Sequence, residues 1–115
     1  MQYLLLIYDD EVDTARRIEA DRGYLKGYGD LARRLRETGE WRGAEPLQPT
    51  STATSVRVRD GELLLTDGPF AETREQLGGF YLIEAENLDR AVEIARQIPA
   101  VTHGTIEIRP IATYG

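Results

Sequence analysis

The chain has 115 residues with no cysteine and one histidine, is 41% hydrophobic and 30% charged, and carries a formal net charge of −6. This length suits one domain with one modest core, residues 1–115, and the acidic balance argues against a nucleic-acid partner because acidic surfaces repel phosphate groups. The absence of cysteine excludes disulfides and thiolate nucleophiles, and one histidine cannot form a histidine-rich metal site within a subunit. The sequence has no phosphate loop, nucleotide fingerprint or metal-ligand cluster, so we expect neither a metal nor a cofactor.

The first apolar run, residues 3–8, predicts a strand. Both of its alternating faces are apolar, whereas a strand covered on one side only alternates with polar residues. We therefore expect a central strand with helices on one face and a second subunit on the other. The run is too short for a signal-peptide core or a membrane span and follows no basic segment, which predicts a cytoplasmic protein with no membrane partner.

A polar turn, Asp9-Asp10-Glu11, is expected next, followed by a helix from residue 14 to residue 38. Thr38-Gly39 supplies the stop signal of that helix. Three glycines between residues 23 and 29 each cost about 1 kcal/mol relative to alanine, so we expect the helix to kink or begin late. The apolar stripe of the helix is Tyr24, Tyr28, Leu31 and Leu35.

The remaining elements follow at short intervals. Residues 41–47 predict a short strand, and residues 53–59 predict another that turns at Asp60-Gly61 into its partner, residues 62–66. Residues 80–85 are apolar on both faces, Asn87 caps a second helix that Pro99 ends, and residues 105–109 form the last strand. This order predicts an α+β, ferredoxin-like fold: a split βαβ sheet with an inserted hairpin and two helices on one face.

Several stretches carry a resemblance to a known family. They are residues 1–8, Glu45-Pro46-Leu47, the stretch TDGPFAET from Thr66 to Thr73, residues 75–81, and Glu107-Ile108-Arg109-Pro110. Together they resemble the DGPF-domain branch of the YCII-related proteins over nearly the whole chain. The resemblance implies a ferredoxin-like subunit that forms a homodimer, a dimeric α+β barrel.

What the resemblance implies about function is limited. Some members carry a His–Asp pair in a pocket and a relative acts in the dehalogenation of an aromatic compound, which implies small-molecule enzymology. Genes of the DGPF branch often lie near those of alternative sigma factors, which implies a regulatory connection. The region where the family histidine is expected reads Gly23-Tyr24-Leu25-Lys26-Gly27-Tyr28 in this sequence, so a mechanism that depends on that histidine does not carry over.

Asp67 is the leading candidate for a catalytic residue. It ends a strand before Gly68-Pro69, where the backbone is constrained, and a carboxylate held beside Phe70 and Tyr81 is suited to act as a general base. The alternative is a structural Asx turn, in which Asp67 accepts hydrogen bonds from the amides of its own turn. Such turns are the commoner role of an aspartate before glycine.

Other side chains are candidates for ligand contacts. Tyr24, Tyr28 and Tyr81 can offer hydroxyl groups to a ligand or act as acids, although helical spacing also suits Tyr24 and Tyr28 to the core. Arg74 can bind a carboxylate or phosphate, or pair with nearby acids such as Glu72.

His103 lies in a loop before the last strand and is the one side chain that ordinarily titrates near neutral pH. A lone histidine in a loop is more often exposed and without a catalytic role, whereas a His103 that reached Asp67, in either subunit, would form an acid–base pair.

Two functions remain open. The first is a homodimeric small-molecule lyase or isomerase with Asp67 as general base, helped by a tyrosine or His103. The second is a non-catalytic ligand-sensing or interaction module linked to sigma-factor-dependent transcription. The sequence does not decide between an enzyme and such a module.

Overall fold

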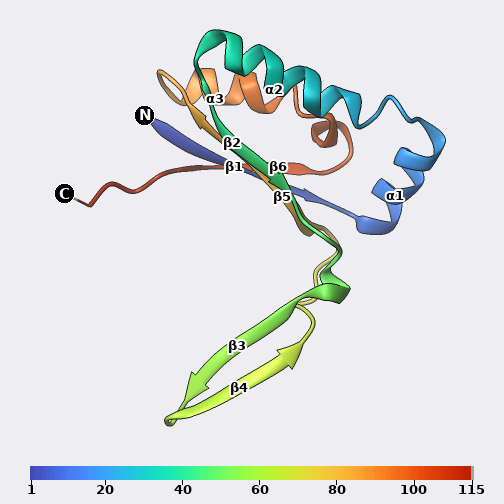
Figure 1. Ribbon diagram of the computed structural model, residues 1–115, viewed down its shortest axis with the longest axis vertical. Helices are drawn as coiled ribbons and strands as arrows, with labels where there is room; N and C mark the ends of the chain where they lie inside the picture. Colours follow the sequence, from blue (N-terminus) through green and yellow to red (C-terminus); the bar gives the residue numbers. More distant parts are fainter. Residues whose placement is uncertain (115) are drawn as a thin grey trace.

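The computed structural model of the protein describes residues 1–114 and has an α+β architecture (Figure 1). In chain order the elements are β1 (Gln2–Asp9), α1 (Glu11–Ala20), α2 (Lys26–Thr38), β2 (Trp41–Pro46), the 3-10 helix η1 (Thr50–Thr52), β3 (Thr54–Arg59), β4 (Glu62–Asp67), β5 (Gln76–Glu84), α3 (Leu88–Ala95), the 3-10 helix η2 (Pro99–Thr102) and β6 (Thr105–Pro110). No helix in this part of the chain is long and apolar enough to cross a membrane.

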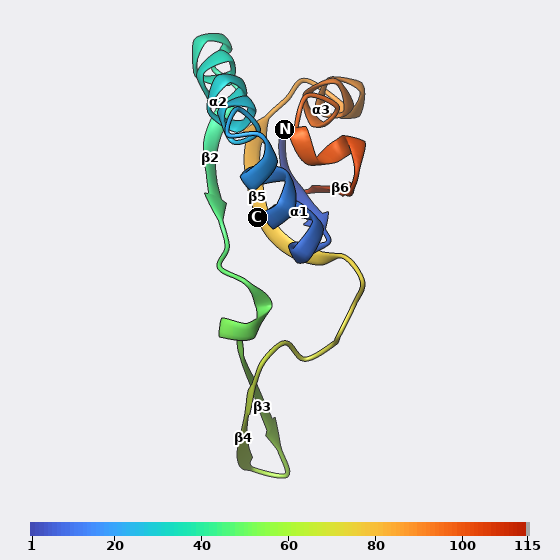
Figure 2. The ribbon, with the colours of Figure 1, turned by 90° about the vertical axis from the view of Figure 1, so that its right-hand side faces the viewer.

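Four strands form an antiparallel sheet in the order β2-β5-β1-β6, so the first strand is central, as its two apolar faces predict. Helices cover one face, with α2 over the β2 side and α3 over the β6 side (Figure 2). The ferredoxin-like α+β fold expected from the sequence is therefore confirmed. The core between the sheet and the helices contains Tyr3, Leu5, Ile7, Leu31, Leu35, Tyr81, Ile83 and Ile94.

The opposite face of the sheet carries no helix (Figure 1). Its central side chains are apolar: Leu4 lies opposite Leu82, and Leu6 lies opposite Phe80. All four are partly exposed within the protomer. The sheet thus has one dry face and one apolar face that is open to water.

The single helix expected over residues 14–38 is wrong; two helices, α1 and α2, occupy this region. α1 begins early because Asp10 is its N-cap, accepting a hydrogen bond from the Asp13 amide at 3.0 Å. It ends before Gly23, whose amide donates to the Asp21 carboxylate at 2.9 Å. The expected polar turn at residues 9–11 is also wrong, because Asp9 belongs to β1 and Glu11 to α1.

A second sheet consists of the hairpin β3–β4, which projects away from the rest of the protomer (Figures 1 and 2). The predicted turn at Asp60-Gly61 is confirmed: both residues have positive φ, 51° and 78°, as a tight hairpin turn requires. Every residue of the two strands except Ser55 is exposed.

Substitutions of Leu35 and Leu88 test the packing between the helices and the sheet. Leu35 in α2 is 2% exposed, so Leu35→Ala should lower the free energy of unfolding by about 2–5 kcal/mol through the cavity that it leaves. Leu88 in α3 is 54% exposed, and Leu88→Ala should change stability much less. Urea denaturation of both variants measures the difference, and equal losses would contradict this assignment of the core.

Candidate functional site

A cavity of about 500 Å³ lies between the α1–α2 corner and the end of the sheet that α1 covers. Its walls are mostly apolar, and its polar side chains include Asp9, Thr14, Tyr24, Tyr28 and Tyr81. The volume is within the range of small-molecule sites. This cavity is the candidate functional site.

Asp9 enters the cavity because of the alternation along β1. Successive side chains of a strand point to opposite faces, so Asp9 follows Ile7 onto the face covered by the helices. A bulge between β1 and β5 leaves Gly78 beside this strand end, where a Cβ atom would lie 3.3 Å from the Asp9 carboxylate. Gly104 approaches from the other side, where a Cβ would collide with the Tyr8 carbonyl. The carboxylate is thus enclosed by backbone that has little room for side chains.

Asp9 is 6% exposed, the one charged residue in the buried core of the described chain. Burial raises the pKa of its carboxyl group, because a low-dielectric setting disfavours the charged form. The Thr14 hydroxyl and His103 lower this pKa, and Glu11 and Glu75 add to the increase. A carboxyl group with a raised pKa can accept a proton more readily than an exposed aspartate at the same pH.

A chain of aromatic side chains runs from this end of the sheet. The Tyr24 hydroxyl lies 2.8 Å from His103 Nε2 and 3.5 Å from the Tyr28 hydroxyl. The Tyr81 hydroxyl donates to the Tyr28 carbonyl oxygen at 2.7 Å. Burial raises the pKa values of all three tyrosines, that of Tyr81 to about 12, so these groups are neutral hydrogen-bond donors at physiological pH.

Near Asp9, His103 Nδ1 is buried without a hydrogen-bond partner among the described residues, and the Thr14 hydroxyl, which lies toward the Asp9 carboxylate, makes no hydrogen bond of ordinary geometry there. The His103 side chain is 5% exposed, and its Nδ1 lies 3.7 Å from an Asp13 carboxylate oxygen. Unpaired buried polar groups are costly, and they are characteristic of sites that receive a ligand. Within residues 1–114, no three acidic or histidine side chains are placed to hold a metal ion.

The structure brings together four of the residues singled out from the sequence: Tyr24, Tyr28, Tyr81 and His103. His103 is in the predicted loop but is buried, which overturns the picture of an exposed loop histidine. The expected packing of Tyr24 and Tyr28 is also found, since both contact other aromatic rings. Both residues nevertheless line the cavity.

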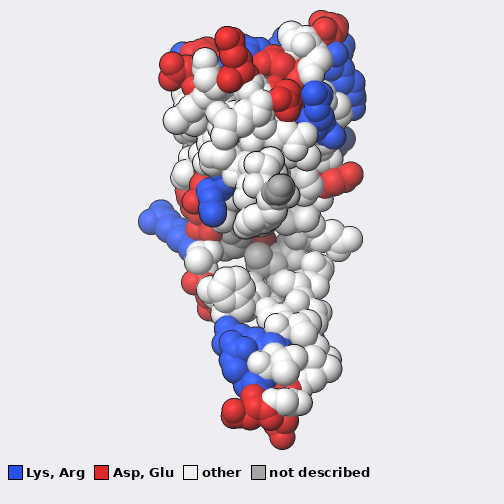
Figure 3. Space-filling view, turned by 90° about the vertical axis from the view of Figure 1, so that its left-hand side faces the viewer, with Lys and Arg blue, Asp and Glu red and all other residues white. Residues whose placement is uncertain are grey.

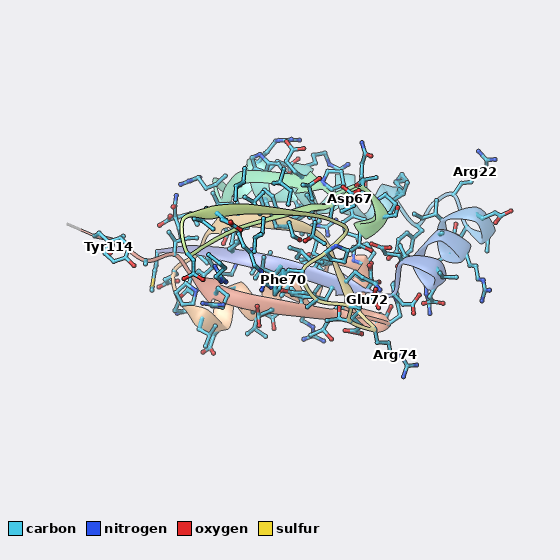
Figure 4. All side chains as sticks on the ribbon, turned by 90° about the horizontal axis from the view of Figure 1, so that it is seen from below. Arg22, Asp67, Phe70, Glu72, Arg74 and Tyr114 are labelled. Carbon is cyan, nitrogen blue, oxygen red and sulfur yellow. The ribbon has the colours of Figure 1, made fainter. Side chains whose placement is uncertain are left out.

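Asp67, Phe70 and Arg74 lie elsewhere, at the root of the hairpin (Figure 4). Asp67 is exposed and Phe70 is 79% exposed, so the apolar setting expected for Asp67 beside Phe70 and Tyr81 is absent from the protomer. Arg74 points away from the sheet into solvent (Figure 4).

The alternative Asx turn at Asp67 also meets a physical obstacle. The amide two residues after an Asx residue normally donates to its side chain, and at this position Pro69 has no N–H group. The Gly68 amide instead donates to the Ala53 carbonyl oxygen at 2.7 Å. The role of Asp67 therefore stays a prediction that the protomer does not explain.

Sequence reasoning missed Asp9 and Thr14. A partial signal for Asp9 was present, because the alternation of the strand continues to Asp9 on the side of Tyr3, Leu5 and Ile7, although both sides of the strand are apolar in the sequence. The acidic run at residues 9–11 concealed this signal by resembling a turn. Thr14 carried no comparable signal, since its burial depends on where α1 docks.

A family model described as "YCII-related domain" matches residues 1–114 of the chain. An uncharacterized protein of Rhizobium meliloti (strain 1021) is 39% identical over 117 residues, which cover 99% of this chain and 94% of that protein. The matched region therefore spans nearly the whole length of both chains.

The raised pKa of Asp9 predicts how stability depends on pH. The folded state holds the proton of Asp9 more tightly than the unfolded chain, so this contribution to stability is fully present below pH 3.8 and is lost as the pH rises through the folded pKa. Asp9→Asn should therefore be more stable than the wild type at neutral pH, and this advantage should vanish below pH 3.8. Urea denaturation between pH 3 and pH 8 measures it.

Asp67→Asn is the matched control for that measurement. Asp67 also ends a strand, but it is exposed and does not line the cavity, so its replacement should not give the stabilisation expected of Asp9→Asn. An Asp9→Asn variant could instead be less stable than the wild type at neutral pH, with a deficit that grows as the pH rises. That result would show that neighbouring groups lower the pKa of Asp9 more than burial raises it.

Proposed function

Because the chain belongs to the YCII-related family and holds a buried carboxylate at a cavity, we propose that it is a small-molecule lyase or isomerase with Asp9 as its general base. The single observation that carries the proposal is Asp9, which is buried and has a raised pKa beside unpaired polar atoms. Perturbed carboxylates in cavities are typical of general acid–base sites. The finding shifts the proposed base from Asp67 to Asp9.

The groups around Asp9 suit the transfer of one proton. Asp9 accepts a proton from a carbon next to a carbonyl or carboxyl group of the substrate, which breaks the C–H bond and leaves the electron pair on the substrate. A neutral tyrosine hydroxyl, Tyr24 or Tyr28, donates a hydrogen bond to the oxygen that gains negative charge. His103 Nε2 hydrogen-bonds the Tyr24 hydroxyl at 2.8 Å and holds it in position. The largely apolar walls fit a substrate with an apolar body and one polar end.

The proposal includes a homodimer that forms an α+β barrel. Leu4, Leu6, Phe80 and Leu82 form an apolar stripe on the helix-free face, and leaving such a stripe in water is unfavourable. A second sheet of the same kind would cover the stripe by face-to-face packing. Each subunit would keep its own cavity, because the cavity lies on the other side of the sheet.

A non-catalytic ligand-sensing module linked to sigma-factor-dependent transcription is the second candidate. One observation favours it: α1 borders the cavity but contributes no buried residue to the core, so a ligand can move α1 at small cost. Co-purification with a sigma factor that depends on the ligand would support this candidate. Turnover of the ligand would support the enzyme.

A two-step experiment tests the proposed function. Small aromatic and aliphatic compounds that carry a carbonyl or carboxyl group are screened for an increase in melting temperature, and the compounds that bind are incubated with the protein and followed by NMR. Asp9→Asn should keep the ligand-induced shift and lose about 10²–10⁴-fold in turnover. Asp67→Asn should retain turnover, because Asp67 lies outside the cavity.

The opposite result has a clear meaning. Loss of turnover in Asp67→Asn with full activity in Asp9→Asn would return the catalytic role to Asp67. Binding without turnover in the wild-type protein, for every compound that raises the melting temperature, would favour the sensing module.

A further inference from the structure

The β3–β4 hairpin has one apolar face that nothing in the protomer covers. Val56 lies opposite Leu65 and Val58 lies opposite Leu63, so these four side chains share a face. Their exposed fractions are 61%, 64%, 59% and 62%, respectively. An isolated two-stranded hairpin is only marginally stable in water, and exposed aliphatic residues add to its tendency to associate. The exposed aliphatic side chains of the hairpin are therefore typical of a surface that packs against another surface.

The root of the hairpin gives it a fixed direction. Gly68 has φ 99°, a conformation that favours glycine, and its amide donates to the Ala53 carbonyl oxygen. The Ser55 hydroxyl donates to the Gly68 carbonyl oxygen at 2.9 Å. The sequence Asp67-Gly68-Pro69-Phe70 thus closes the base of the hairpin and sets the angle at which the chain leaves it.

This direction places the hairpin below the helix-free face of the sheet, from which it diverges to leave an open wedge (Figures 1 and 4). A groove of about 680 Å³ lies at the closed end of the wedge. Tyr8 and Leu77 from the sheet and Phe70 from the root of the hairpin line it. The apolar sheet face and the hairpin therefore lie on the same side of the protomer, and the groove joins the sheet to the root of the hairpin.

We infer that the β3–β4 hairpin is a dimerisation arm that packs its apolar face, Val56, Val58, Leu63 and Leu65, on a second copy of this chain. A stable interface buries about 800 Å² on each partner, from 20–30 residues. The four aliphatic residues of the arm are too few to supply that area, whereas the arm and the sheet face together offer a larger surface. In a two-fold dimer each copy would present both surfaces to the other.

The charge pattern of the arm argues against a membrane as the occupant. Its tip carries Arg59, Asp60 and Glu62, and Figure 3 shows charged residues gathered there and at the opposite end of the molecule, with a mostly uncharged surface between the two. A hairpin that enters lipid would need an apolar tip, because charged groups are costly in a bilayer. The uncharged part instead lies between the tip and the sheet, where a second copy would sit.

The absence of cysteine allows a direct test in the full chain. Leu65→Cys places a thiol on the apolar face, and Leu64→Cys places one on the opposite face as the matched control. In the protomer Leu65 is the more exposed of the two, 64% against 43%. Alkylation by iodoacetamide is timed at protein concentrations where light scattering reports a dimer. The thiol of Leu65→Cys should react at least tenfold more slowly than that of Leu64→Cys, which reverses the order expected for the protomer.

A second pair of variants tests the same contact by measuring the affinity of the dimer. Leu65→Glu should raise the dimer dissociation constant at least tenfold relative to Leu64→Glu, measured by analytical ultracentrifugation, with circular dichroism as the check that both variants fold.

This inference rests on the homodimer proposed above, and the experiment separates the two. Fast alkylation of Leu65→Cys within a dimer would overturn the arm and leave the sheet-to-sheet contact standing. A monomer at every concentration, with both thiols reactive, would overturn both. Protection that persists in a diluted monomer would place the hairpin on its own protomer and would also overturn the arm.

Discussion

The burial of one carboxylate, Asp9, is the constraint on which the site depends. The alternation of β1 puts this side chain on the helix-covered face, where α1 and the loop before β6 close over it. An ionised carboxylate is unfavourable in this buried, low-dielectric position. Few neighbouring groups, among them Thr14 and His103, favour the charged form of Asp9. Among residues 1–114, the neighbouring His103 keeps an unpaired Nδ1 and Thr14 makes no hydrogen bond of ordinary geometry through its hydroxyl. A structure that retains such a cluster gives up stability, which is characteristic of functional sites.

The sheet divides the protein into two regions with different roles. On one side, the helices and the sheet form the core and hold the cavity. On the other side, the apolar stripe of the sheet and the hairpin remain open to water. In the proposed dimer the second region would hold the subunits together and leave the first free to bind a ligand. Chemistry and assembly would then depend on different residues, and each can be altered without the other.

The parts of the fold that are coded locally could be predicted from the sequence. Residues 3–8 predicted a central strand, Asp60-Gly61 predicted the hairpin turn, and Asn87 predicted a helix cap. Each of these features depends mainly on residues that are neighbours in the sequence. The glycines between residues 23 and 29 were expected to kink the helix or delay its start; α2 does begin late, at Lys26, but the separate helix α1 was not expected. The direction of the hairpin depends on long-range hydrogen bonds at Gly68, which no local pattern reveals.

The candidate site was predictable only in part. Its tyrosines and His103 were identified by residue type, but the carboxylate that accompanies them was assigned to Asp67. That assignment used the rigid backbone before Pro69 as a sign of function, whereas rigidity at this position orients the hairpin. Asp9 could have been found by continuing the strand alternation one step further. Its surroundings could not, because the bulge at Gly78 arises from pairing between distant strands.

The most direct test is an NMR titration of the Asp9 side chain, with carbon-13 in the carboxyl group and Asp9→Asn used to assign its signal. Burial predicts a midpoint above the ordinary aspartate value of 3.8. A midpoint at or below 3.8 would show that Asp9 is solvated or fully paired, and would contradict the account of a buried base at the cavity.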